Sequence, residues 1–419
     1  MAWSASAIRQ RLHRRTLTVL LAAVLACWGL SGCTREAVLS FSYVDPTVIT
    51  PNADGNNDAC LVAYKLRRSA LVSIYLVDEA GNRHYFRRQV RRAAGEYAVL
   101  FGGVVDGRVL PDGVYRLVIE AEPVGGGKVG REEWGLEIRE ADTDYPQIIG
   151  LSVFPDRFTP NRDGLGDRVR ISYDLSKDVA LVSVYLEDSQ GRRYPVPEDK
   201  LQKPGAKGHH EHDYDGGIDL GAEPPPEGLY KVVVVAEDAV GNRARAETQL
   251  YIEEGGVPRA AIVKSGEGTG VKWSAEVVPL GDVLTFTLRV ENIGKVPIRT
   301  HGPEPGTVYN NNENFNTLGF PEDPGTFRIG INYEGNSAGD PYPYRWQLGR
   351  SEELAKITFQ GRDYYYLMPG QVVTVTGGIR MVEAPPLRKP RFWAGLIQEH
   401  VEYVPGEEYV NPTQITIGY

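Results

Sequence analysis

The chain has 419 residues, of which 42% are hydrophobic and 24% charged, and its formal net charge is −9. This length exceeds one ordinary hydrophobic core and predicts two to four domains, of which we expect three. The acidic balance argues against a nucleic-acid-binding protein. With 47 Gly, 28 Pro and 23 Tyr, the composition favours β-strands joined by tight turns.

The first 32 residues have the features of a secretory signal. Four Arg precede the apolar run TLTVLLAAVLACWGL, which is short for a membrane-spanning helix and ends in LSGC at 30–33. LSGC resembles the lipobox of bacterial lipoproteins, which implies that residues 1–32 are removed and that Cys33 carries the lipid anchor. The alternative is a plain secretory signal in which Cys33 has no role.

Removal of the signal has two consequences. It leaves 42 basic and 55 acidic residues, a net charge of −13, which is expected to repel nucleic acid and anionic lipid headgroups. It also leaves Cys60 without a partner, because Cys27 departs with the signal and Cys33 is acylated. We therefore predict no internal disulfide and a buried, inert thiol at Cys60.

After a short tether at 33–40, the chain contains an internal duplication. Three pairs of matching segments define it: TPNADGNND (50–58) and TPNRDGLGD (159–167), ALVSIYL (70–76) and ALVSVYL (180–186), LPDGVYRLVIEAE (110–122) and PPEGLYKVVVVAE (225–237). Two copies of one folded unit, at 41–140 and 145–254, are the economical interpretation.

Each copy has the pattern of short strands with alternating or β-branched residues, as at 71–76 and 230–235, bounded by Gly, Asp, Asn and Pro turns. No sustained helical period occurs after the signal. About seven strands in roughly 95 residues predict an immunoglobulin-like (Ig-like) sandwich for each copy.

The order of motifs in each copy carries a resemblance. TPNxDGxxD, a strand of the type VSVYLEDSQGRR, and then P-x-G-x-Y-x-V-x-V-x-A-x-D closing at Gly241-Asn242 are similar to the Ig-like domain of the flagellar hook-capping protein. They are equally similar to C-terminal domains of gliding-bacterium proteins. The resemblance covers 41–138 and 153–254 and implies an Ig-like fold. It implies no flagellar role, because one fold serves many functions.

The third segment, 258–419, is not another copy. Three stretches are strand-like: VLTFTLRVENIGKVPIRT (283–300), QVVTVTGGIRM (371–381) and TQITIGY (413–419). The first resembles strand-and-turn elements of Ig-like modules in bacterial surface proteins. The predicted fold is therefore all-β, with three Ig-like β-sandwich domains in tandem after a lipoprotein signal peptide. An insertion rich in Asn, Gly, Tyr and Pro fills 308–350, and loops of this length are usually functional or disordered.

The repeated loops have two interpretations. They resemble the D-x-D-G core of calcium loops and offer hard oxygen ligands around a Gly. The alternative is an Asx turn, in which Asn and Asp side chains accept backbone N–H groups where the chain enters a strand. The candidate calcium ligands are Asn52, Asp54, Asp58, Asn161, Asp163 and Asp167.

The stretch GHHEHDYDGG gathers three of the seven His. On a strand, His210 and His212 would share one face and could bind a transition metal. The stretch lies in the loop where the two copies diverge, however, and two ligands on one face without a fixed third bind weakly. Motifs of known hydrolases, phosphate loops and CxxC pairs do not occur, and we predict that the protein is not an enzyme.

Aromatic residues of the third domain are the candidates for recognition. Their flat faces and hydroxyl groups suit sugar stacking or a protein contact, and the alternative is that part of them fill the core. The candidates are Tyr342, Tyr344, Trp346, Tyr365 and Trp393.

Together these patterns predict an exported lipoprotein on the extracytoplasmic face of a bacterial membrane. The Ig-like pair would be a stalk, and the third domain would recognise a surface protein or a glycan. A carbohydrate- or cell-wall-binding accessory protein is the alternative. Calcium is the one candidate cofactor, and we expect no nucleic-acid partner.

Overall fold

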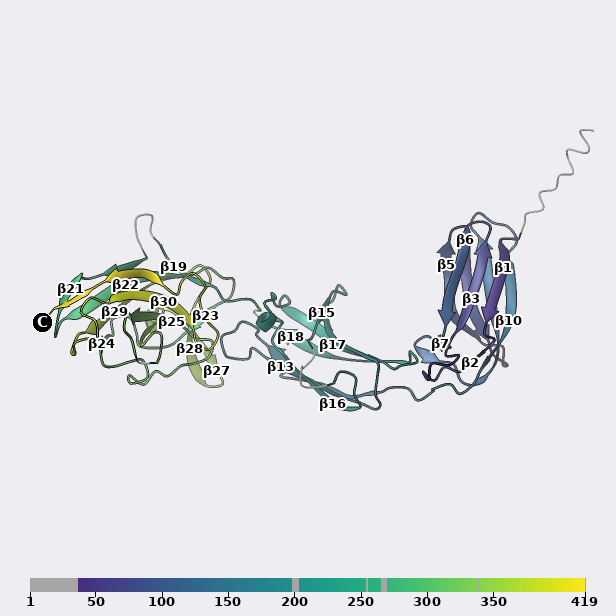
Figure 1. Cartoon of the computed structure of the whole chain (residues 1–419), viewed down its shortest axis with the longest axis horizontal. Helices are drawn as coiled ribbons and strands as arrows, with labels where there is room; N and C mark the ends of the chain where they lie inside the picture. Colours follow the sequence, from purple (N-terminus) through teal and green to yellow (C-terminus); the bar gives the residue numbers. More distant parts are fainter. Residues whose placement is uncertain (1–36, 198–202, 254, 265–269, 338, 419) are drawn as a thin grey trace, which may run out of the picture. The chain divides into compact units, whose positions relative to one another are not determined.

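The computed structural model describes residues 37–197, 203–253, 255–264, 270–337 and 339–418. They form two compact units: the chain up to Tyr145 together with Glu237–Arg243, and Pro146–Ala236 together with Ala244–Tyr419. The signal peptide and Cys33 lie outside the described residues. The regular structure of the described residues is β-strand apart from two short 3-10 turns, Ile218–Leu220 and Ser351–Glu353, which confirms the all-β fold class (Figure 1).

The first sandwich is made of two sheets. The smaller has the order β1-β3-β6, with β1 at Leu39–Asp45, β3 at Cys60–Leu66 and β6 at Gly95–Phe101. The larger has the order β2-β10-β9-β4-β5, with β2 at Val48–Ile49, β10 at Gly130–Ile138, β9 at Gly113–Pro123, β4 at Ala70–Val77 and β5 at Arg83–Arg92. A small hairpin, β7 (Val104–Val105) and β8 (Arg108–Val109), lies outside these sheets.

Alternation of side chains explains how the first sandwich acquires its core. Along β3, Cys60, Val62, Tyr64 and Leu66 are buried, whereas the residues between them are more exposed. The larger sheet contributes residues of β4 and β9 to the same hydrophobic cluster. Burial raises the pKa of the Cys60 thiol to about 11, so this residue is a buried, protonated core residue.

The two sheets of the second sandwich repeat those of the first strand for strand. Its sheets have the orders β11-β13-β16 and β12-β18-β17-β14-β15. The bounds are Ile148–Phe154 (β11), Arg157–Phe158 (β12), Val169–Leu175 (β13), Leu181–Glu187 (β14), Arg193–Pro195 (β15), Gly208–Tyr214 (β16), Gly228–Glu237 (β17) and Arg243–Ile252 (β18). The duplication seen in the sequence is therefore a duplication of sheet order.

One side chain closes both sandwiches in the same way. Tyr115 at the start of β9 donates a hydrogen bond to the carbonyl of Pro111 at 2.8 Å, and Tyr230 at the start of β17 donates to the carbonyl of Pro226 at 2.6 Å. Each Tyr is buried and fixes the turn before its strand, as the tyrosine corner of Ig-like sandwiches does.

The third domain also has two main sheets. The strand order β19-β22-β29-β24 forms one, with β20 also paired to β22, and β27-β28-β23-β25-β30-β31 forms the other, with β26 paired to β25 and β32 to β30. The bounds of the first are Ala260–Ile262 (β19), Val271–Trp273 (β20), Val283–Asn292 (β22), Val308–Asn310 (β24) and Val372–Arg380 (β29). Those of the second are Ile298–Thr300 (β23), Phe327–Tyr333 (β25), Tyr344–Gln347 (β26), Ala355–Phe359 (β27), Arg362–Leu367 (β28), Arg391–Gln398 (β30), Glu402–Tyr403 (β31) and Val410–Gln414 (β32). A separate parallel pair joins β21 (Val277–Pro279) to β33 (Thr416–Gly418).

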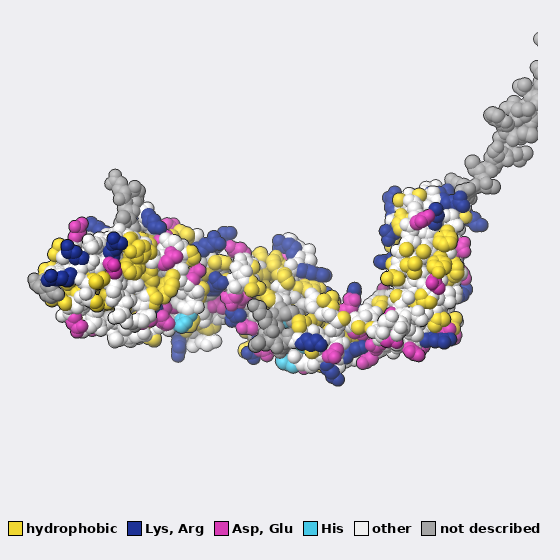
Figure 2. Space-filling model, viewed as in Figure 1, with side chains coloured by type: hydrophobic (Ala, Val, Ile, Leu, Met, Phe, Trp, Pro, Cys, Tyr) yellow, Lys and Arg dark blue, Asp and Glu magenta, His cyan; other side chains and the backbone are white. Residues whose placement is uncertain are grey.

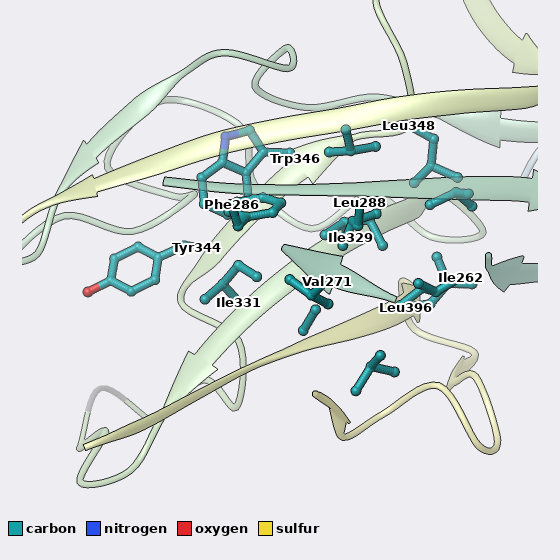
Figure 3. Close-up of a cluster of buried hydrophobic side chains, with 14 of the residues drawn as sticks. Ile262, Val271, Phe286, Leu288, Ile329, Ile331, Tyr344, Trp346, Leu348 and Leu396 are labelled. Atoms are coloured by element: carbon teal, nitrogen blue, oxygen red, sulfur yellow. The ribbon is translucent and has the colours of Figure 1, made fainter. Parts of the chain in front are cut away.

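The core of the third domain lies between these sheets. Phe286 and Leu288 of β22 meet Ile329 and Ile331 of β25 and Trp346 of β26 (Figure 3). Within the described part of the chain, none of the helical segments has the length and hydropathy that crossing a bilayer requires.

Candidate recognition site

The first repeated loop, 50–58, is held by hydrogen bonds from its own backbone. The Asp58 carboxylate accepts three N–H groups of the loop at 3.2, 2.8 and 2.9 Å. Asn52 Oδ1 accepts the N–H of Asp54 at 3.0 Å, and Asp54 accepts the N–H two residues later at 2.7 Å. These are the Asx turns that the sequence suggested as one of two interpretations.

The second loop, 159–167, has the same internal bonds with one exception: Asp163 donates to the closing carboxylate where the first loop uses Ala53, the counterpart of Arg162. The Asp167 carboxylate accepts the N–H groups of Asn161, Asp163 and Gly164 at 3.1, 3.3 and 2.6 Å. Asn161 Oδ1 accepts the N–H of Asp163 at 3.0 Å, and Asp163 accepts the N–H two residues later at 2.8 Å. The repeated motif therefore encodes one turn, built twice.

The second loop also binds the third domain, within the same compact unit. Tyr366 of β28 donates its hydroxyl hydrogen to the Asp163 carboxylate at 2.7 Å. Arg299 of β23 donates its Nε–H to the Asp163 carbonyl at 2.6 Å and binds both oxygens of Asp323 at 2.9 and 3.1 Å. Gln398 of β30 donates to the carbonyl of Arg162 at 2.7 Å. Three strands of the third domain thus hold this loop.

Two glycines make this approach sterically possible. A Cβ on Gly164 would lie 2.2 Å from the Pro324 carbonyl oxygen, and a Cβ on Gly325 would lie 2.3 Å from the Asp163 carbonyl carbon. Both residues also have positive φ, at +84° and +80°. Backbone therefore packs directly on backbone, with no room for a side chain on either residue.

Burial in this contact changes the electrostatics of the loop. Burial raises the pKa of Asp163, although the Tyr366 hydroxyl opposes the change. Burial, together with the negative charge of Asp163, raises the pKa of Asp167 to about 6. Burial and the same carboxylate also raise the pKa of Tyr366, which stays a hydrogen-bond donor at neutral pH.

Fewer loop oxygens are available to bind calcium than the sequence indicates. The oxygens of Asp58 and Asp167 already accept backbone N–H groups, and one oxygen of Asp163 accepts a Tyr hydroxyl. Within the described residues, no group of three or more His, Cys, Asp or Glu side chains is arranged to hold a metal ion. The hydrogen bonds account for the six candidate ligands, and calcium binding stays a prediction.

The three His of GHHEHDYDGG lie on β16. His210 and His212 share one face, as a strand requires, and both stack on Tyr173, with ring centroids 5.2 and 5.7 Å away. His210 lies opposite Tyr173 in the register, the place that Tyr97 takes opposite Tyr64 in the first sandwich. Both His are buried, so the structure assigns them to aromatic packing.

Three of the five recognition candidates fill the core. Tyr342, Tyr344 and Trp346 are between 0% and 4% exposed, which corrects their assignment as a binding surface. Trp346 contacts Phe286 and Tyr309 edge-on and donates its Nε1–H to a backbone carbonyl, so its faces are not open to a ligand. Figure 3 shows Trp346 over the buried cluster.

A groove beside β28 contains the fourth candidate. It has a volume of about 560 Å³ and includes half-buried Tyr364 and Tyr365. The Arg299 guanidinium lies 5.4 Å from the centroid of the Tyr364 ring. Trp393, the fifth candidate, is half-buried on β30 against Tyr409 and does not line this groove. Polar and charged residues complete the groove wall: Arg299, His301, Glu322, Asp323, Arg362 and Asp363.

The groove wall is fixed by a buried arginine that the sequence analysis missed. Arg328 of β25 is fully buried and donates to the carbonyls of His301, Phe320 and Pro321 at 2.6, 3.2 and 2.9 Å. Its charge is balanced by Glu399 at 3.2 Å. Burial and the positive charge of Arg328 lower the pKa of His301, so a ligand at neutral pH meets a neutral imidazole.

No known protein family and no characterised protein matches this sequence. The chain is similar to a solved tetra-tandem repeat from the extending region of a large adhesion protein, at 13% identity over 90% of this chain and 73% of that chain, with a TM-score of 0.20. It is also similar to fibronectin(III)-like modules of Clostridium thermocellum CbhA, at 10% identity over 51% of this chain and 94% of that chain, with a TM-score of 0.21. A bacterial ice-binding adhesin matches at 12% identity over 83% of this chain and 99% of that chain, with a TM-score of 0.18. The strand orders of the sheets themselves define the three β-sandwiches.

Proposed function

We propose that the chain is an exported lipoprotein that displays a recognition domain at the cell envelope and catalyses no reaction. Cys33 would carry the lipid on the extracytoplasmic face of a membrane. The two Ig-like sandwiches would act as a stalk, and the third domain would bind a surface protein through its groove.

The observation that carries this proposal is the attachment of the third domain to the second sandwich. A domain that only needed to be tethered would require a linker and no more. Here Asp163 is 5% exposed and is bound by Arg299 and Tyr366 from the far side of the contact. Buried polar contacts of this kind are costly unless they are fully paired, so they fix one orientation. The groove beside β28 is thereby presented on a rigid support.

The groove is suited to a polar partner with a flat apolar group. Tyr364 and Tyr365 line the groove together with charged side chains of both signs. Aromatic and Arg residues in such positions dominate the binding energy of many interfaces. Alanine at Tyr365 is expected to weaken binding by about 2 kcal/mol, roughly 30-fold.

The test compares two variants of the intact protein. Surface proteins that cross-link to the wild-type protein in cells would first be identified. The affinity of each purified partner for the wild type and for both variants would then be measured. Tyr365→Ala should reduce the affinity, whereas Val308→Ala, an exposed apolar residue on β24 of the same domain, should not. Equal binding by both variants would show that the groove is not the recognition site.

A carbohydrate-binding accessory protein is the second candidate, and the paired tyrosines favour it. Tyr faces stack on sugar rings, and the neighbouring carboxylates and guanidinium groups can bind sugar hydroxyls. A glycan array separates the two candidates. A carbohydrate-binding protein should bind glycans on the array, and Tyr365→Ala should abolish that binding. Absence of glycan binding together with a protein partner would leave the first proposal.

The anchor has its own test. Mass spectrometry of the N-terminal peptide from membranes should show a lipid-modified Cys33 as the first residue. Cys33→Ser should release the protein from the membrane fraction or leave the signal attached. An unmodified, correctly cut N-terminus would reject the lipoprotein part of the proposal and leave the recognition part intact.

A further inference from the structure

The first sandwich has opposite charges at its two ends. At one end lie the β3–β4 turn, the last residues of β5 and the β9–β10 turn. The register places them together, because Ala70 pairs with Arg92, and the N–H of Val124 donates to the carbonyl of Ser69 at 2.9 Å. We call this the basic end; its six basic residues are Lys65, Arg67, Arg68, Arg91, Arg92 and Lys128.

Among the residues that the structure describes, acidic side chains at the basic end are fewer than basic ones. Glu96 forms an ion pair with Lys65 at 2.8 Å, and Glu122 lies opposite Leu71 in the register. The other end of the sandwich is acidic, although Arg83, Arg108 and Arg139 lie there too. Its acidic residues are Asp45, Asp54, Asp58, Asp78, Glu79, Asp106, Asp112, Glu140, Asp142 and Asp144.

Described structure begins at the basic end. The carbonyl of Val38 accepts the N–H of Arg67 at 2.9 Å, and Leu39 pairs with Leu66 at the end of β3. Figure 2 shows Lys and Arg side chains gathered on this end of the sandwich. The 36 residues that precede the described chain, including the apolar run of the signal and Cys33, therefore join the sandwich where its basic residues lie.

Apolar side chains accompany the basic ones. Val124 and Val129, in the turn that contains Lys128, are each 44% exposed. A surface with both exposed basic and exposed apolar side chains is complementary to a lipid headgroup region, where phosphates lie above acyl chains. The Arg92 guanidinium lies 5.3 Å from the centroid of the Tyr97 ring, and this cation–π contact positions the side chain.

We propose that the basic end of the first sandwich docks on a membrane surface rich in anionic phospholipid headgroups. The proposal rests on the anchoring part of the proposed function, which brings Val38 within about 18 Å of a lipidated Cys33, because only five residue steps separate them. The basic end would then hold the first sandwich against the surface in which Cys33 is anchored.

The net negative charge of the chain does not oppose this contact. Strands of the sandwich are up to 11 residues long, as β9 is, which separates the two ends by about 35 Å. Salt screens exposed charges over about 8–10 Å at physiological ionic strength, so the acidic end has little influence on a lipid surface at the basic end. The expectation of repulsion from the whole-chain charge therefore does not apply locally.

The test uses protein that begins at Thr34 and carries no lipid, which retains every described strand. Its binding would be measured by co-sedimentation with vesicles of phosphatidylcholine alone and of phosphatidylcholine mixed with phosphatidylglycerol. We expect binding to the anionic vesicles only, and loss of that binding at high salt. Equal binding to both vesicles, or none to either, would overturn the proposal while leaving the Cys33 modification to its own test.

Two triple variants with the same change in net charge locate the contact. The first variant, Arg67→Gln with Arg91→Gln and Lys128→Gln, alters exposed residues of the basic end. Each basic residue near an anionic surface contributes about five-fold to binding. The three substitutions are therefore expected to weaken vesicle binding on the order of 100-fold. Lys272→Gln with Arg289→Gln and Arg391→Gln alters exposed residues of the third domain and should leave binding nearly unchanged. Equal losses in the two variants would contradict a local contact. Circular dichroism of both variants checks that the folds are intact.

A separate measurement compares soluble polyphosphate with vesicles. If the wild-type protein binds polyphosphate as tightly as it binds anionic vesicles, the membrane is not the specific occupant of the basic end.

Discussion

The two repeated loops share nearly all their internal hydrogen bonds and have different surroundings. In the first loop, Asp54 and Gly55 are exposed, whereas in the second Asp163 is 5% exposed under residues of the third domain. The comparison separates two roles that one motif can have. The shared residues form a turn, and the additional role of the second loop is supplied by its partners, Arg299 and Tyr366.

The largest expected difference comes from equivalent glycines. Gly164→Ala should destabilise the second unit by about 2–4 kcal/mol, because its Cβ would overlap the Pro324 carbonyl at 2.2 Å. Gly55→Ala should cost about 1 kcal/mol, since its φ is also positive, at +88°, but no atom lies within 4 Å of a Cβ there. Urea unfolding monitored by fluorescence, together with scanning calorimetry, measures the cost of each substitution. Equal costs would show that the second loop is as open as the first.

A single hydroxyl tests the same contact more gently. Tyr366→Phe removes the donor to Asp163 and leaves a buried carboxylate oxygen without it, at an expected cost of about 1–3 kcal/mol. Tyr365→Phe, one residue earlier on β28, is the matched control and should change the free energy of unfolding by less than about 0.5 kcal/mol. A smaller effect of Tyr366→Phe than of its control would break the comparison.

Acid should stabilise the docked loop. The folded-state pKa of Asp167 is about 6, above the value of about 3.9 for an unfolded chain. The folded state therefore binds more protons between these values, so its stability falls as pH rises from about 4 to 6. We expect the second unit to gain about 1 kcal/mol on going from pH 7 to pH 5. Thermal unfolding across this range measures the gain, which Asp167→Asn should abolish.

The smallest effect concerns calcium and the exposed loop. Asp54→Ala removes one Asx hydrogen bond and should cost about 0.5–1 kcal/mol. A calcium site predicts in addition that calcium raises the melting temperature of wild type and that Asp54→Ala together with Asp163→Ala removes the rise. We expect no rise, because the loop carboxylates already serve backbone donors. A calcium-dependent rise would restore the metal interpretation.

Much of the fold could be predicted because it is encoded locally. The strand-like stretch 283–300 contains β22 and β23, 371–381 contains β29, and 413–419 contains β33. Alternating apolar residues and Gly-Asp-Asn turns are sufficient for these elements, and the duplication gave two independent views of one topology.

The site could not be predicted to the same extent, for two physical reasons. Asp163 contacts Arg299 and Tyr366, which are 136 and 203 positions away, and no local pattern encodes such pairs. Tyr344 and Trp346 share one face of β26, and the sequence alone does not show whether that face meets the core or a ligand. On β26 both faces are covered: Trp346 lies in the core, and Arg345 is buried in ion pairs with Glu322 and Glu399 at 3.0 and 2.6 Å.

Arg328 has a consequence for how the groove can vary among descendants of this sequence. It binds two neighbouring segments through the carbonyls of His301, Phe320 and Pro321, and a carbonyl is present whatever side chain the residue carries. Substitutions in these segments can therefore change what the groove contacts without removing the bonds that hold it in place. One conserved guanidinium would then be compatible with many binding specificities.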